Sequence, residues 1–391
     1  MIALQVVVFV AGLLLVVRAL VSEIQTFVVP RGAYDSISSL EFRVIGALFF
    51  RVARPSFGYE RRDAIMALFA PVGLVILPAV LLAMVLAGFA AMFWALAPDT
   101  IEAAVRQSGS ALLTLGFAPI QGWPALLLSF AEAAIGLILV ALLIAYLPTM
   151  YTAFQRREAF VAKLDVRAGT PASGTELLIR FASVGLLGDL TELWTEAEAW
   201  FIDLAESHTT LAALPFYRSP RSSRSWITAA GAILDGASLL RSTIDVPVEP
   251  RADLVITAGF GTLDEIAAFF RIPTIERPAR AGDPIRVTQA EYDAAVEELA
   301  AAGLPIRADR EQAWLDFAGW RVNYEDALLR LSILVMAPDA RWNETARRAT
   351  TRRARRKARR SARRSGVRCP PATTTRRARP CRSGRRRRAR T

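Results

Sequence analysis

Three long uncharged stretches stand out in the sequence, at residues 2–17, 64–98 and 133–155. The second covers 35 positions and the third covers 23, and most of their side chains are aliphatic or aromatic. A helix needs about 20 mainly apolar residues to cross the hydrocarbon core of a bilayer, so each stretch predicts a transmembrane helix. We therefore expect an all-α membrane protein with three transmembrane helices, the first of them at residues 1–21.

The first apolar stretch is expected to be retained rather than cleaved. A secretory signal peptide needs basic residues before its apolar core and a small-residue cleavage site after it. No basic residue precedes this stretch, and the sequence from Arg18 to Ser22 offers no convincing site. An uncleaved N-terminal span fits better.

Basic residues are distributed unevenly between the two connections. The linker at residues 22–63 carries six arginines, whereas residues 99–124 carry only Arg106. Because short connections rich in Arg and Lys stay on the cytoplasmic side of a membrane, the bias predicts a cytoplasmic linker and an external N-terminus. Everything after Tyr151 is then expected in the cytoplasm.

The segment at residues 99–124, between the second and third spans, is too rich in serine, glycine and proline for a full span. It suits a short helix that enters the membrane and returns as an irregular strand. Exposed backbone at membrane depth is tolerated where protein covers it or where it lines a water-filled path. Residues 64–155 are therefore predicted to form a pore module, with a re-entrant pore loop between two spans.

The sequence Thr114-Leu115-Gly116-Phe117-Ala118 is a candidate ion filter. A potassium filter replaces the water around the ion with rings of backbone carbonyls from four TVGYG-type loops. Such a loop needs a threonine hydroxyl at its inner end and glycines where φ is positive. Ala118 stands where a second glycine is expected, and an alanine in the left-handed conformation costs about 1 kcal/mol.

Two further sequences are informative: VVPRG, after the first span, and SFAEAAIGLILVALLIAYLPTMYTAFQRRE, after the filter. With the LGFA of the filter, they make residues 68–158 resemble bacterial two-span potassium channels of the ion-channel pore superfamily. The resemblance is to actinobacterial-type members with an extra N-terminal span. It implies a multi-pass homotetramer in a bacterial plasma membrane. It also implies potassium or another monovalent cation as the transported species, with no cofactor.

Glu132 and Gly136, in the third span, are candidates for pore-lining or gating residues. A carboxylate inside a span is a functional candidate, here one that braces the filter or attracts cations. The alternative is that Glu132 lies close enough to the interface to be solvated. Gly136 is either a gating hinge or a site of close helix packing, and we favour packing.

Residues 156–340 predict an all-α domain in the cytoplasm. Ser173 with Glu176, and Thr288 with Glu291, have the spacing of capping boxes that open helices. Segments containing proline and glycine separate the helical patterns. One helical face carries mainly large apolar side chains, which predicts a packed core rather than a ligand site. Its residues are Leu193, Trp194, Ala197, Trp200, Phe201 and Leu204.

No catalytic or metal-binding arrangement is evident in the sequence. Residues 253–264 have two glycines of a nucleotide-binding turn but lack the third glycine and a βαβ context, so a plain helix is favoured. The only histidine, His208, has no nucleophile motif beside it, and no metal cluster, P-loop or paired-acid signature occurs. We expect neither enzymatic activity nor a metal site.

The basic character of the chain comes from one segment. The chain carries 48 Lys or Arg and 36 Asp or Glu, but 21 of the basic residues and none of the acidic ones lie in residues 345–391. Residues 341–391 are therefore predicted to be a disordered Arg-rich tail, which also holds both cysteines. The tail is either an arm for nucleic acid or anionic lipid or, as its composition favours, an out-of-frame stretch of GC-rich coding sequence. Nucleic acid is thus an unlikely partner.

Two functions are consistent with these patterns. The first is passive, potassium-channel-like transport of cations through a tetrameric pore, with selectivity set by the carbonyls of residues 114–117. The alternative is a channel-like membrane protein that does not conduct and instead anchors the cytoplasmic domain or serves as its sensor. Ala118 and Pro119, which depart from the family pattern, motivate this alternative.

Overall fold

The structure, a computed structural model, describes residues 1–29, 36–54, 56–97, 99–273 and 283–342. Within these ranges the chain is mostly helical and has no strand, only an isolated bridge between Ile244 and Ile306. The predicted all-α class is confirmed for this part of the chain. The prediction of a disordered tail lies almost wholly outside the described residues.

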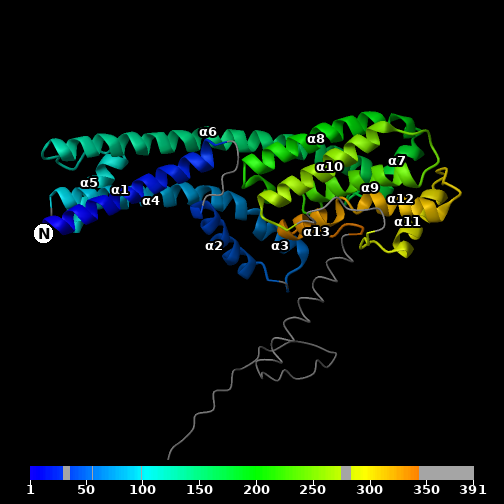
Figure 1. The fold of residues 1–391 in the computed structure, drawn as a ribbon, viewed down its shortest axis with the longest axis horizontal. Coiled ribbons are helices and arrows are strands. Elements are labelled where there is room, and N and C mark those ends of the chain that lie inside the picture. The colour runs from blue at the N-terminus through cyan, green and yellow to red at the C-terminus, as the bar shows by residue number, and fades with distance from the viewer. Residues whose placement is uncertain (30–35, 55, 98, 274–282, 343–391) are drawn as a thin grey trace, which may run out of the picture. The chain divides into compact units, whose positions relative to one another are not determined.

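Thirteen α-helices and two short 3-10 helices follow one another in the described ranges (Figure 1). The first six are α1 (Ile2–Phe27), α2 (Ser36–Val52), α3 (Tyr59–Ala67), α4 (Phe69–Leu96), α5 (Ile101–Leu112) and α6 (Trp123–Ala168). The remainder are α7 (Gly174–Ser183), η1 (Leu187–Asp189), α8 (Leu190–Thr210), η2 (Leu214–Phe216), α9 (Trp226–Ser242), α10 (Pro250–Phe269), α11 (Gln289–Ala301), α12 (Arg310–Arg321) and α13 (Glu325–Leu334).

Three helical stretches are long and apolar enough to cross a membrane: α1, the α3–α4 pair (Tyr59–Leu96) and α6. They coincide with the three predicted spans, and they support a multi-pass membrane protein. Their bounds are wider than predicted, because the first helix runs to Phe27 and the third begins at Trp123. The expected division at residue 155 falls inside α6, which continues to Ala168.

Helices α1 and α4 pack closely through a pair of glycines. A Cβ atom on Gly12 would lie 2.5 Å from the carbonyl oxygen of Gly88, and one on Gly88 would lie 2.6 Å from the Val16 side chain. Small residues at a helix crossing let two apolar helices approach until their backbones touch. In a bilayer, where the hydrophobic effect does not drive helices together, such close van der Waals packing stabilises their association. This contact joins the N-terminal helix to the module that contains the candidate filter.

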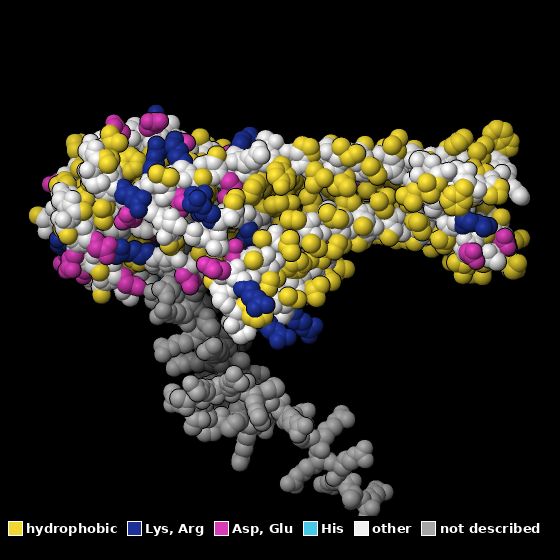
Figure 2. Space-filling view, turned by 180° about the vertical axis from the view of Figure 1, so that it is seen from behind, with side chains coloured by type: hydrophobic (Ala, Val, Ile, Leu, Met, Phe, Trp, Pro, Cys, Tyr) yellow, Lys and Arg dark blue, Asp and Glu magenta, His cyan; other side chains and the backbone are white. Residues whose placement is uncertain are grey.

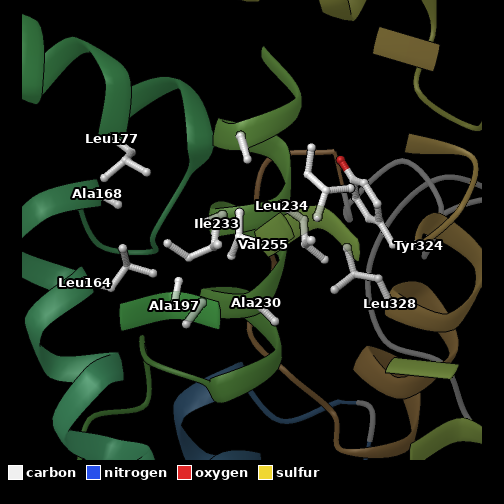
Figure 3. Packing of buried hydrophobic residues seen from close by; sticks show 14 of the residues in the cluster. Leu164, Ala168, Leu177, Ala197, Ala230, Ile233, Leu234, Val255, Tyr324 and Leu328 are labelled. Atoms are coloured by element: carbon white, nitrogen blue, oxygen red, sulfur yellow. The ribbon is translucent and has the colours of Figure 1, made fainter. Parts of the chain in front are cut away.

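The helices α7 to α13, together with the end of α6, form a helical domain around α9. Sixteen of the seventeen residues of α9 are buried. Figure 3 shows Ile233 and Leu234 of α9 in the middle of this core, with Val255, Leu328 and Tyr324 around them. Leu164 and Ala168 of α6 belong to the same cluster, so α6 contributes to the core of the domain.

The predicted apolar face of residues 193–204 is buried in this core, as expected. The surface of the candidate spans differs from that of the helical domain. Figure 2 shows hydrophobic side chains gathered over α1, α4 and α6, and charged side chains of both signs scattered over the helical domain.

Candidate functional site

Helix α5 is the predicted short helix between the second and third spans. Its first turn is capped by Thr100, whose hydroxyl accepts a hydrogen bond from the amide of Ala103 at 3.2 Å. Ala104, Ser108 and Leu112, spaced four residues apart, are buried and form the face that packs against α4 and α6. The helix has 12 residues, so at about 1.5 Å per residue it is roughly 18 Å long and too short to span a bilayer.

Ser108 and Glu132 form a buried polar contact between α5 and α6. The Ser108 hydroxyl oxygen lies 2.5 Å from Oε1 of Glu132 and 2.9 Å from the carbonyl oxygen of Leu86 in α4. A hydroxyl has only one hydrogen, so both contacts are hydrogen bonds only if a protonated Glu132 donates to Ser108 while Ser108 donates to Leu86. The contact thus ties three helices together, and we expect the Glu132 carboxyl group in it to be neutral.

A second polar layer connects α5 to the segment that follows it. Gln107 Nε2 donates to the Ser129 hydroxyl of α6 at 3.2 Å. The Ser110 hydroxyl accepts a hydrogen bond from the amide of Ala118 at 3.1 Å, and the Ser110 carbonyl accepts one from the amide of Leu115 at 2.9 Å. Ser110 therefore folds the candidate filter back onto the end of α5.

The backbone of the candidate filter is left-handed at two positions. Thr114 has a φ angle of 55° and Gly116 one of 69°. Gly116 is the position where the filter pattern requires a glycine. Ala118 is not among the described residues with positive φ, so the left-handed conformation expected there is wrong, and the unfavourable conformation falls on Thr114 instead.

The filter side chains are open to the surroundings in a single chain. Leu115 and Phe117 are each 60 % exposed. Thr114 and Gly116 are exposed as well, and Ala118 is half-buried. Apolar side chains this exposed are normally covered by lipid or by another protein chain.

Glu132 and Gly136 lie on the face of α6 that meets α5. Glu132 is fully buried and contacts the middle of α5, so the structure does not leave it solvated within the single chain. A Cβ atom on Gly136 would lie 2.5 Å from the carbonyl oxygen of Leu112, at the end of α5. Close packing, the favoured interpretation of Gly136, has this direct geometric support. The pore-lining and gating roles of the two residues stay predictions.

Sequence reasoning missed the roles of Ser108 and Ser110. Both were regarded only as residues that make a full span unfavourable. Because the two serines are two residues apart, they point in different directions. The Ser108 hydroxyl contacts α4 and α6, and the Ser110 hydroxyl contacts the segment that follows α5. Buried hydroxyl groups on a short helix flanked by apolar spans were the signal that could have found them, because such groups need partners.

The remaining sequence candidates have structural roles. Residues 253–264 lie inside α10, so the plain helix is confirmed and the nucleotide-binding turn is excluded. Gly259 is explained by packing, because a Cβ atom there would lie 2.5 Å from Leu234. His208 is fully buried near the end of α8, with Nδ1 3.1 Å from the Ser207 hydroxyl oxygen and its ring 4.7 Å from that of Trp226. Burial, with the nearby charge of Arg157, holds the His208 pKa well below its usual value.

Within the described ranges, no group of three or more His, Cys, Asp or Glu residues is placed to hold a metal ion. Comparison of the chain with protein-family models, with curated proteins and with solved structures finds no match. The resemblance to two-span potassium channels therefore stays a prediction from the sequence.

Proposed function

We propose that this chain forms a homotetrameric pore in a bacterial plasma membrane and lets potassium or other monovalent cations pass passively. The observation that carries the proposal is helix α5, braced between two candidate spans and followed by an exposed segment with positive φ at Thr114 and Gly116. In this proposal the segment re-enters the membrane, the N-terminus is outside and the helical domain lies in the cytoplasm.

The C-terminal end of α5 favours a cation beside it. The carbonyl groups in the last turn of a helix carry a partial negative charge, equivalent to roughly half an elementary charge. Residues 113–122 begin at that end, so a cation at the candidate filter would interact with the helix dipole as well as with filter carbonyls. The residues assigned to the filter are Thr114, Leu115, Gly116, Phe117 and Ala118.

Several copies of the chain are needed for such a pore, because one segment cannot surround an ion. The exposed filter side chains are consistent with a fourfold arrangement in which neighbouring copies cover them. Helix α6 adds a line of exposed apolar residues, Leu127, Phe130, Leu137 and Ile144, that has room for another copy or for lipid.

The test is cation flux into proteoliposomes that contain the full chain. We expect potassium flux to exceed sodium flux, and Gly116→Asp to abolish it, because a carboxylate at the filter disturbs the carbonyl ring. Gly185→Asp is the matched control. Both glycines have positive φ, 69° and 73°, and open space around the Cβ position, but Gly185 follows α7 in the helical domain.

The outcomes separate the two functions. A tetramer whose potassium flux is lost in Gly116→Asp and kept in Gly185→Asp supports the pore. An intact tetramer that carries no flux, even with Ala118→Gly, would favour the non-conducting anchor or sensor. A monomer in detergent and in vesicles would contradict the pore outright.

A further inference from the structure

A large apolar pocket lies where the candidate spans meet the helical domain. Its volume is about 540 Å³, within the roughly 300–1,000 Å³ of small-molecule sites. The end of α1, helix α2, the start of α4, one residue of α6 and parts of the helical domain surround it. Aromatic rings dominate its lining: Phe27, Phe42, Phe69, Tyr146, Phe216 and Phe270.

The amphipathic helix α2, which forms one wall, has an apolar outer face. Leu40, Val44 and Leu48 follow one another at four-residue intervals and are 56 %, 61 % and 60 % exposed. The neighbouring face, with Glu41 and Ile45, is buried. A helix that turns aliphatic side chains outward while it packs on a transmembrane module is expected to lie at the membrane interface, among lipids.

The pocket also has positive charge. Arg43 of α2 and Arg271, just after α10, belong to its lining, and both residues are exposed. One guanidinium group can donate two parallel hydrogen bonds to two oxygens of a phosphate. Basic pockets between membrane helices on the cytoplasmic side bind the head groups of anionic lipids. Arg51 and Arg54, also exposed, follow on the same helix or directly after it and add to the positive charge near α2.

We infer that this pocket binds a membrane phospholipid with an anionic head group. One acyl chain would occupy the aromatic interior, and the phosphate would lie at Arg43 and Arg271. The outward apolar face of α2 favours a lipid over a soluble ligand, because it brings the pocket to the bilayer. The inference requires that the chain is embedded in a membrane but does not depend on cation conduction.

Retained lipid can be weighed directly by native mass spectrometry. The full chain is reconstituted in vesicles of equal parts phosphatidylglycerol and phosphatidylcholine and then extracted in mild detergent. We expect one phospholipid to remain bound per chain, with phosphatidylglycerol enriched at least fivefold over phosphatidylcholine. No retained lipid, or a retained fatty acid without phosphate, would overturn the inference.

Filling the pocket should expel the lipid. Gly46 lines the pocket, and a Cβ atom there would only touch the Phe69 ring, at 3.7 Å, so Gly46→Leu is expected to fold and to lower lipid retention about tenfold. Gly261→Leu, at an exposed helical glycine of α10 with open space around it, is the matched control and should retain lipid. Ala47→Phe, at an exposed residue of the same lining, is a second filling variant.

The charge requirement is tested separately. Arg43→Gln with Arg271→Gln should remove the preference for phosphatidylglycerol, whereas Arg251→Gln with Arg310→Gln, at two exposed arginines outside the lining, should keep it. All variants contain the same Arg-rich residues 345–391, so lipid bound there contributes equally to every chain. Unchanged retention in both filling variants, or an unchanged preference in the arginine variant of the pocket, would contradict the inference.

Discussion

The buried side chains of Arg321 and Asp235 are held by specific partners from other helices. Arg321 is fully buried, and its guanidinium Nε donates to Glu325 at 2.9 Å while another nitrogen pairs with Asp235. The Tyr324 hydroxyl donates to the same Asp235 carboxylate at 2.8 Å. Burial of a charged group is tolerated only with such compensation. Glu132 and His208 are expected to satisfy the requirement differently, by staying uncharged, and each expectation can be tested.

Glu132→Gln should be nearly neutral, and Glu132→Ala should be destabilising. A glutamine amide can still donate to Ser108, as a neutral carboxyl would, whereas alanine leaves the buried Ser108 hydroxyl without this partner. We expect a loss of about 1–3 kcal/mol for alanine and under about 1 kcal/mol for glutamine. The measurement is thermal unfolding in detergent, with Glu102→Ala, at an exposed acid of α5, as the control. Equal destabilisation by both substitutions would contradict the neutral carboxyl.

His208 should make the folded state less stable in acid. In the folded chain its pKa is held well below the usual value by burial and by Arg157, so the ring stays neutral as the pH falls. In the unfolded chain it binds a proton near pH 6.5, which favours unfolding below that pH by up to about 1.4 kcal/mol per pH unit. The stability difference between wild type and His208→Gln should therefore shrink from pH 7 to pH 5. Other titrating groups are common to both chains, so a constant difference would contradict this.

At the scale of elements, helix α6 connects the candidate membrane module to the helical domain without a break. Its 46 residues extend roughly 69 Å, more than twice the thickness of about 30 Å that a hydrocarbon core requires. Beyond the apolar part, the buried Arg157 donates to the carbonyl oxygens of Leu214 and Tyr217 at 2.9 and 2.8 Å. A displacement of the domain would therefore be transmitted directly to the helix that packs on α5.

The contact between α6 and the end of α5 predicts the effect of a single methyl group. Gly136→Ala places a Cβ atom 2.5 Å from the Leu112 carbonyl oxygen, so α5 must move and the candidate filter with it. We expect a loss of about 1–3 kcal/mol in stability and of most cation flux. Gly109→Ala, in α5 itself, would have its nearest neighbour at 4.0 Å and should be tolerated. Unchanged stability and flux in Gly136→Ala would contradict the packing role.

At the scale of the whole molecule, the helical domain contacts two different candidate spans. Besides α6, it holds α3, because Arg218 pairs with Asp63 at 3.0 Å and donates to the carbonyl oxygen of Met336 at 2.9 Å. Tyr59 of α3 also donates to that carbonyl oxygen, at 3.5 Å. In the proposed membrane arrangement, these contacts predict that the start of the second candidate span and the end of the third lie on the same side of the membrane as the domain.

That topology can be tested by labelling single cysteines in cells. With Cys369 and Cys381 replaced by serine, the chain has no other cysteine. Glu102→Cys, exposed at the start of α5, should react with a membrane-impermeant maleimide in intact cells. Glu192→Cys, exposed in α8, should react only after permeabilisation. Labelling of Glu192→Cys in intact cells would reverse the predicted orientation.

The sequence by itself determined the features that depend on neighbouring residues. The three candidate spans follow from the length of apolar runs, which a helix must bury or expose to lipid wherever it lies. Helix starts are similarly local: Thr288 and Glu291 form the complete capping box, and Ser173 accepts a hydrogen bond from the Glu176 amide. Each of these signals involves residues no more than one turn apart.

Only the tertiary structure decided the features in which distant residues meet. Ser108 and Glu132 are 24 positions apart, and the Ala118 amide donates to a hydroxyl of α5 that lies eight positions earlier. The buried Arg157 side chain of α6 donates hydrogen bonds to carbonyl oxygens of residues 214 and 217, which lie 57 and 60 positions further along the chain. Partners this far apart in sequence leave no local signal, since each side chain alone fits several environments and only the fold selects among them.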